Sequence, residues 1–142
     1  MNEPKPHILV AKNHPLASRQ DVSLREVAEE PFIMIKTLPA RPLIMQVFAA
    51  AGVTPHVRFN SGNFDHIRSL VQQEMGYSMV SQTIGATPAH WTDDVVAVPV
   101  NDPVPPAYVV IASVDQARLT RRAQAFREFC LRRYQNGNQP EA

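Results

Sequence analysis

The feature that most constrains the fold is an alternation of short apolar runs with helical stretches through the middle of the chain. Residues 32–35 (FIMI), 57–59 (VRF) and 77–80 (YSMV) have the length and apolar character of buried strands. The stretches between them show helical spacing of apolar residues and end near Gly52 and Gly76, which suit the left-handed position after a helix. This order predicts right-handed crossovers and a mostly parallel sheet flanked by helices, the α/β class.

Further elements are predicted on either side of this alternation. Strands are expected at residues 7–11, buried on both faces, and at residues 95–100 and 108–112. Ser23 and Glu26 form a capping box, which predicts a short helix over residues 22–27. A long helix is expected from about residue 119. The apolar faces of the three longer helices are predicted to contain Leu43, Val47, Ala50 and Ala51, then Phe64, Ile67, Leu70, Val71 and Met75, and finally Ala123, Phe126, Cys130 and Tyr134.

Polar residues follow three of the predicted strands. Because ligands bind at the carboxyl ends of parallel strands, these three turns are expected to form one rim. Their hydroxyls, amides and helix N-terminal N–H groups suit a small polar or anionic ligand and are poorly suited to catalysis. The predicted binding residues are Lys36, Thr37, Asn60, Ser61, Asn63, Ser81 and Gln82. Ser61 and Asn63 keep a second interpretation, since each also suits the N-cap of the following helix.

No catalytic or metal-binding pattern stands out in the sequence. The five histidines are scattered, with no cysteine partners and no pair four residues apart, so neither a metal ion nor another cofactor is expected. The chain has no G-x-S-x-G elbow, phosphate-binding glycine loop or dinucleotide fingerprint. Cys130 falls on the packed face of the last predicted helix, which favours a small core residue over a nucleophile. We therefore expect no enzymatic activity.

Charge and hydropathy narrow the range of partners. The formal net charge of +1 gives no overall field that would attract nucleic acid. A solvated helix face explains the late arginines more simply than a phosphate-binding surface. These arginines are Arg118, Arg121, Arg122, Arg127, Arg132 and Arg133. No apolar run approaches the ~20 residues that cross a bilayer, so no membrane partner is expected. The opening residues lack the zones of a signal peptide, which favours a cytoplasmic location.

Several segments, taken in order, resemble the effector-binding domain of LysR-type transcriptional regulators, also called the LysR substrate-binding domain. Residues 9–17 (LVAKNHPLA) are similar to the family's strand and turn LV…HPLA. Residues 22–33 (VSLREVAEEPFI) resemble VSLxDLAxEPFI, and residues 50–55 (AAGVTP) resemble AAGxxP. The longest similarity covers residues 63–82, which resemble xxExVRxLVxxGxGYxLLxQ. The order and spacing of these segments extend over nearly the whole chain.

The resemblance implies a periplasmic-binding-protein-like fold of type 2, in which an effector binds between two lobes. Residues 18–105 would form the second regulatory lobe, and residues 1–17 a crossing strand and turn from a truncated first lobe. Residues 106–134 would supply a returning strand and terminal helix, and residues 135–142 a disordered tail. The family's helix-turn-helix has no counterpart among these residues. Any DNA binding would therefore belong to a domain absent from this sequence.

Two positions depart from the family pattern. Glu74-Met75-Gly76 stands where the family usually has two glycines, which affects the geometry of that turn. Thr83 stands where a basic residue usually follows Gln82, which leaves the charge preference for the ligand open.

The function that the resemblance implies is the sensing of a small-molecule effector for a LysR-type regulator. The alternative is a stand-alone solute-binding or dimerising interaction module. Because most of the first lobe is missing, an apolar patch and self-association are expected. The residues expected to form this patch include Ile8, Val10, Phe126 and Tyr134.

Overall fold

The computed structural model describes residues 5–82, 94–105, 111–113 and 119–135. The chain divides into two compact units. We call Pro4–Pro106 the sheet unit, and Ala107–Ala142 together with Met1–Glu3 the helical unit. Each unit is considered by itself below.

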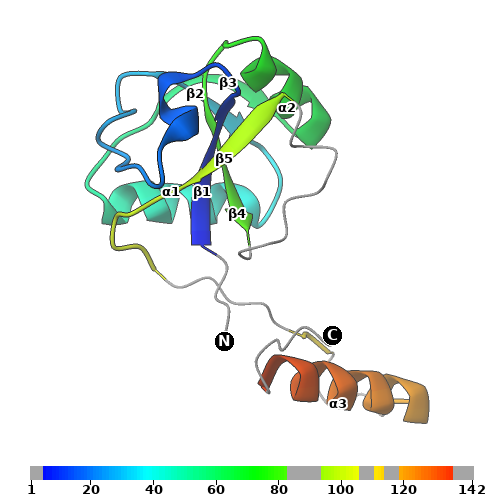
Figure 1. Ribbon diagram of the computed structural model, residues 1–142. Coiled ribbons are helices and arrows are strands. Elements are labelled where there is room, and N and C mark those ends of the chain that lie inside the picture. The colour runs from blue at the N-terminus through cyan, green and yellow to red at the C-terminus, as the bar shows by residue number, and fades with distance from the viewer. Residues whose placement is uncertain (1–4, 83–93, 106–110, 114–118, 136–142) are drawn as a thin grey trace. The chain divides into compact units, whose positions relative to one another are not determined.

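The sheet unit is built on two small sheets (Figure 1). β1 (Lys5–Ala11) lies in the middle of the first sheet and pairs antiparallel with β4 (Ser78–Gln82) and with β5 (Val95–Pro99). β2 (Pro31–Ile35) and β3 (His56–Ser61) form a parallel pair, as the sequence predicts. The antiparallel direction of β1 was not predicted, and it makes the three-stranded sheet antiparallel, whereas the two-stranded sheet is parallel.

A single parallel bridge between Phe32 and Tyr77 connects the two sheets. The amide of Ile33 donates to the carbonyl oxygen of Tyr77 at 2.8 Å, and the hydroxyl of Ser78 donates to the carbonyl oxygen of Ile33 at 2.8 Å. β4 therefore starts out parallel to β2, which is the direction that the predicted strand–helix alternation requires. The buried hydroxyl of Ser78 is satisfied by this bond, as buried polar groups in folded proteins usually are.

Alternate residues of the strands supply two separate apolar cores. Ile8 and Val10 of β1 pack into a large core on one face, whereas Leu9 packs into a smaller core on the other. This alternation follows from the period of two in a strand, and it confirms the prediction that residues 7–11 are buried on both faces. The large core also contains Phe32, Met34, Ile44, Phe48, Tyr77, Met79 and Val98, and the small core contains Ile33, Ile67, Val71 and Val95.

One helix packs against each core. α1 (Ala40–Ala50) contributes Ile44 and Phe48 to the large core, and α2 (Phe64–Gln72) contributes Ile67 and Val71 to the small core. The predicted face of the first helix was partly wrong, since its buried side is turned towards Ile44 and Phe48, while Leu43 and Ala50 are exposed. Tertiary packing against β2 selects this side, because several apolar stripes are available on a helix with so few charges.

The short helix predicted over residues 22–27 was wrong. This segment forms successive turns, although half of the capping box is present, with the Ser23 amide donating to the Glu26 carboxylate at 2.9 Å. The Ser23 hydroxyl donates instead to the carboxylate of Asp102 at 3.0 Å, and the Leu24 amide donates to the same carboxylate at 2.7 Å. Asp102 therefore fixes the segment from a distant part of the chain. A 3₁₀ helix, η1 (Pro15–Ser18), was also not predicted.

The turn after α2 contains the departure from the family's two glycines. α2 ends at Gln72, three residues earlier than the predicted stripe to Met75 implies. Glu74 adopts φ 57°, and Gly76 adopts φ 150°. A non-glycine residue with φ near 57° is uncommon, because its Cβ crowds the backbone there. A glutamate thus occupies a position whose backbone favours glycine.

Replacing Glu74 with glycine is expected to stabilise the sheet unit by about 0.5–1 kcal/mol. Relief of the left-handed strain, about 1–2 kcal/mol, exceeds the entropy that glycine adds to the unfolded chain. Gln73, with φ −81°, is the matched control, and Gln73→Gly is expected to destabilise by a similar amount. Urea unfolding followed by circular dichroism measures both changes. A loss of stability in Glu74→Gly would contradict the strain argument.

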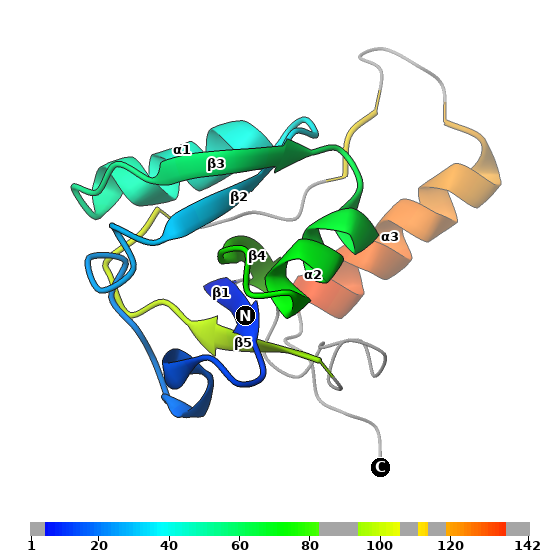
Figure 2. The same cartoon turned by 90° about the horizontal axis from the view of Figure 1, so that it is seen from above.

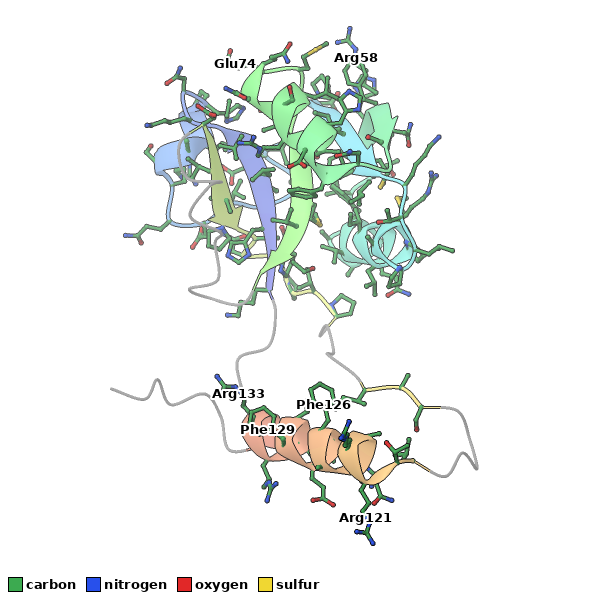
Figure 3. All side chains as sticks on the ribbon, turned by 90° about the vertical axis from the view of Figure 1, so that its right-hand side faces the viewer. Arg58, Glu74, Arg121, Phe126, Phe129 and Arg133 are labelled. Carbon is green, nitrogen blue, oxygen red and sulfur yellow. The ribbon has the colours of Figure 1, made fainter. Side chains whose placement is uncertain are left out.

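The helical unit contains α3 (Arg121–Gln135), whose first turn is capped by the hydroxyl of Thr120, which accepts from the Ala123 amide at 3.2 Å. Phe126 is 65% exposed within this structure, and Phe129 is also exposed (Figure 3). Leu131 is exposed as well. The expected apolar patch was wrong for Ile8 and Val10, two residues of β1 that are buried in the large core. For Phe126 it stays a prediction. The side chain of Tyr134, most of the predicted strand 108–112 and the tail 136–142 lie outside the described residues.

Candidate functional site

Two of the three predicted turns meet at the carboxyl ends of β2 and β3. Ile35 is level with Ser61 in the parallel ladder, and the amide of Lys36 donates to the carbonyl oxygen of Ser61 at 2.8 Å. Figure 2 shows the two strands side by side with their arrowheads at the same end, and the chain passing from β3 into α2. The turns that contain Lys36 and Ser61 are thus held together by a backbone hydrogen bond.

The turn between β3 and α2 is organised by Asn63. Its side-chain oxygen accepts from the amides of Asp65 at 2.8 Å and His66 at 3.2 Å, so Asn63 is the N-cap of α2. The alternative prediction of Ser61 as an N-cap was wrong. Ser61 is the last residue of β3, and its hydroxyl accepts from the Asn63 amide at 3.1 Å. It therefore shapes the turn that leads into the helix.

His66 is a polar residue of this turn that the sequence analysis did not include. Its Nδ1 lies 3.1 Å from the hydroxyl oxygen of Ser61. His66 is the third helical residue after the Asn63 cap, and side chains at that position reach back towards the start of the helix. That spacing was the signal available in the sequence. His66 has no cysteine partner and no histidine four residues away, so it does not match a metal-binding pattern.

The polar groups of the two joined turns differ in accessibility. Ser61 is only 8% exposed, whereas Lys36, Thr37 and Asn60 are exposed. The carbonyl oxygen of Thr37 accepts from the Arg41 amide at 3.1 Å, so the backbone of Thr37 leads directly into α1. Exposed ammonium, hydroxyl and amide groups on two joined turns can hold a small polar ligand by hydrogen bonds.

The third predicted turn follows β4. Ser81 is exposed and lies opposite Pro6 in the antiparallel ladder with β1, and Gln82 lies opposite Lys5. The side chain of Gln82 and all of Thr83 lie outside the described residues. β4 touches β2 through one bridge rather than a ladder, so backbone pairing does not tie this turn to the other two. The seven predicted residues thus fall into a joined group of five and a separate pair.

Other polar groups of the sheet unit serve the fold. Burial of the Tyr77 phenol raises its pKa above the usual value for tyrosine, and the nearby charge of Glu30 adds to this effect. Arg68 lies 4.0 Å from Asp94, at the limit of an ion pair. Within the described ranges, no three His, Cys, Asp or Glu side chains are grouped so as to hold a metal ion. The helices described here include none with the length and apolar character to cross a membrane.

Comparison with solved structures shows a common fold. HinK, a LysR family transcriptional regulator from Pseudomonas aeruginosa, aligns with a TM-score of 0.75 and 27% identity, over 90% of this chain and 44% of that chain. The effector binding domain of QuiR in complex with shikimate aligns with a TM-score of 0.80 and 24% identity, over 97% of this chain and 65% of that chain. These similarities establish the periplasmic-binding-protein-like α/β fold that the resemblance implied.

Comparison of sequences points to the same group of proteins. The Bacillus subtilis HTH-type transcriptional regulator YwbI is 28% identical over 124 residues, which are 85% of this chain and 40% of that protein. The chain thus spans less than half the length of this relative. The LysR substrate binding domain family matches residues 4–135, which is nearly the whole sequence. This chain therefore belongs to the LysR substrate binding domain family.

Proposed function

We propose that this chain is the non-catalytic, effector-sensing part of a cytoplasmic LysR-type transcriptional regulator. It binds a small polar or anionic molecule at the turns that follow β2, β3 and β4, and DNA is bound by a domain outside this sequence. Ligand binding shifts an equilibrium between conformations of the regulator and so alters its activity. The single observation that carries the proposal is the hydrogen bond from the Lys36 amide to the Ser61 carbonyl oxygen, which brings two polar turns together.

The ligands of similar structures support an anionic effector. Similar structures include the effector binding domain of QuiR in complex with shikimate and that of BenM with its effector benzoate, and each alignment covers 97% of this chain. Shikimate and benzoate are both carboxylate anions. Lys36, exposed on the turn whose backbone is bonded to Ser61, offers an ammonium group as a partner for a carboxylate, since charge-assisted hydrogen bonds are stronger than neutral ones.

Substitution of Lys36 provides the test. In an NMR titration of the chain with benzoate and shikimate, amide signals of residues 36–37 and 60–66 are expected to shift. Lys36→Ala is expected to weaken binding about tenfold, which corresponds to the loss of one charge-assisted hydrogen bond. Lys12, an exposed lysine in the turn after β1, is the matched control, and Lys12→Ala is expected to leave the affinity unchanged. Equal affinities for the two variants would remove Lys36 from the site.

A second function is favoured by the exposed aromatic residues of α3. Phe126 and Phe129 are unusually exposed for phenylalanine, and exposed apolar groups of this kind mark association surfaces. In this alternative the chain is a stand-alone solute-binding or dimerising module, in which α3 pairs with a second copy. Light scattering coupled to size-exclusion chromatography separates the two cases. A monomer over a wide range of concentrations would argue against the dimerising module.

A further inference from the structure

We propose that the carboxylate of Asp102 is a latch that holds the segment through which the chain leaves the sheet unit, and that the latch opens without unfolding this unit. The chain passes between the two units before Pro4 and after Pro106. A latch at Asp102 therefore sets how much of the second connection is free to move. The inference is independent of the proposed function, because it involves no ligand.

The segment that follows β5 changes from apolar packing to polar contacts after Val100. Val100 belongs to the large core, and its amide donates to the carbonyl oxygen of Pro6 at 3.0 Å. The next residue, Asn101, is exposed and is attached by two hydrogen bonds instead. Its amide donates to the carbonyl oxygen of Val22 at 3.0 Å, and its side chain donates to the carboxylate of Asp21 at 2.9 Å. Beyond Val100 the segment thus depends on groups for which water can compete.

Asp102 supplies two further contacts of this segment. Its carboxylate accepts from the Ser23 hydroxyl at 3.0 Å and from the Leu24 amide at 2.7 Å, and charge-assisted bonds of this kind are stronger than neutral ones. The side chain of Leu24 is fully buried in the large core, so the latch is anchored to a fixed part of the sheet unit. Ser23 and Asp102 are half-buried, which gives water access to these bonds and allows them to open locally.

Opening of the latch changes the connection to the helical unit in two ways. Residues 101 and 102 join the free part of the connection, and two extended residues add about 7 Å to its reach. Pro103 and Pro105 follow directly, and this stretch is stiff because each proline ring fixes its own φ. A stiff stretch takes its direction from its point of attachment. The closed latch at Asp102 therefore aims the stretch, and the open latch releases it.

Hydrogen exchange in the full chain tests the latch at the Leu24 amide, whose proton is bonded to Asp102. In the wild type this amide is expected to exchange by local opening, at a rate that depends little on denaturant, whereas the amides of β1 exchange by global unfolding. Asp102→Ala is expected to speed exchange at Leu24 about tenfold, through loss of one charge-assisted hydrogen bond, and to leave β1 unchanged. Asp102→Asn keeps one acceptor oxygen and is expected to have a smaller effect. Glu29→Ala, which removes an exposed carboxylate outside these contacts, is the matched control and is expected to leave Leu24 unchanged.

A second readout, ¹⁵N relaxation, shows whether the latch affects the connection. In Asp102→Ala the Val104 amide is expected to gain nanosecond motion, and α3 to tumble faster relative to β1 than in the wild type. Unchanged relaxation of both would overturn the role of the latch in the connection. Unchanged exchange at Leu24, or equal acceleration at Leu24 and β1, would overturn the latch itself. Where neither variant of Asp102 folds, the wild-type chain still tests the proposal, since exchange at Leu24 that rises with denaturant as steeply as in β1 contradicts local opening.

Discussion

Replacement of Gly76 by alanine is expected to destabilise the sheet unit by about 3–5 kcal/mol. Gly76 has φ 150°, which side chains rarely adopt, and a Cβ there would collide with the carbonyl oxygen of Pro31 and lie 3.0 Å from its carbonyl carbon. Strain of the backbone costs about 1–3 kcal/mol, and overpacking against a fixed group costs a similar amount. The close approach cannot relax easily, because the Tyr77 amide donates to that same carbonyl oxygen at 3.0 Å.

Gly62 provides the matched control for this substitution. It has no atom within 4 Å of an added Cβ and is not among the residues with positive φ, so Gly62→Ala is expected to change stability by less than about 0.5 kcal/mol. Guanidinium unfolding followed by circular dichroism compares the two variants. Similar free energies of unfolding for Gly62→Ala and Gly76→Ala would show that the contact with Pro31 does not exclude a side chain at residue 76.

The alternation of apolar runs and helical stretches was sufficient to predict the parallel pairing of β2 and β3. Such a crossover depends on local patterns that the sequence shows directly. The antiparallel direction of β1 depends on contacts with β4 and β5, which are far away in the sequence, and no local pattern records it. The prediction of a helix at residues 22–27 was wrong for the same reason. The hydroxyl of Ser23 donates a hydrogen bond to Asp102, nearly eighty residues later, instead of capping a helix.

The candidate site was predictable where it depends on strand order and less so where it depends on side-chain geometry. The carboxyl ends of parallel strands placed Lys36 and Ser61 on adjacent turns, as the rule for α/β sheets requires. Asn63 rather than Ser61 is the cap, and Ser61 contacts His66. Both facts depend on where side-chain atoms lie to within a few tenths of an ångström. Residue types alone do not contain that information. The place of Ser81 and Gln82 within the site stays a prediction.

Truncation of Phe32 to alanine is expected to cost about 3–5 kcal/mol of the stability of the sheet unit. Phe32 is fully buried, and its ring lies 5.1 Å from that of Phe48 and 5.0 Å from that of Tyr77, both in edge-to-face geometry. The substitution removes apolar burial and two aromatic contacts and leaves a cavity among residues of α1, β2 and β4. Since Phe32 also forms the bridge to Tyr77, the loss is expected to loosen the connection between the two sheets.

Phe126 of α3 gives a comparison with the same change of side chain at an exposed position. Because Phe126 is 65% exposed, Phe126→Ala removes little burial within the described structure, and it is expected to change the stability of the sheet unit by less than about 0.5 kcal/mol. Hydrogen exchange at the amides of β1 reports on the sheet unit alone, since global unfolding of that unit exposes them. The amides of β1 are expected to exchange faster in Phe32→Ala, and their exchange rates are expected to be unchanged in Phe126→Ala. Equal acceleration by both would contradict the link between the burial of Phe32 and the stability of the sheet unit.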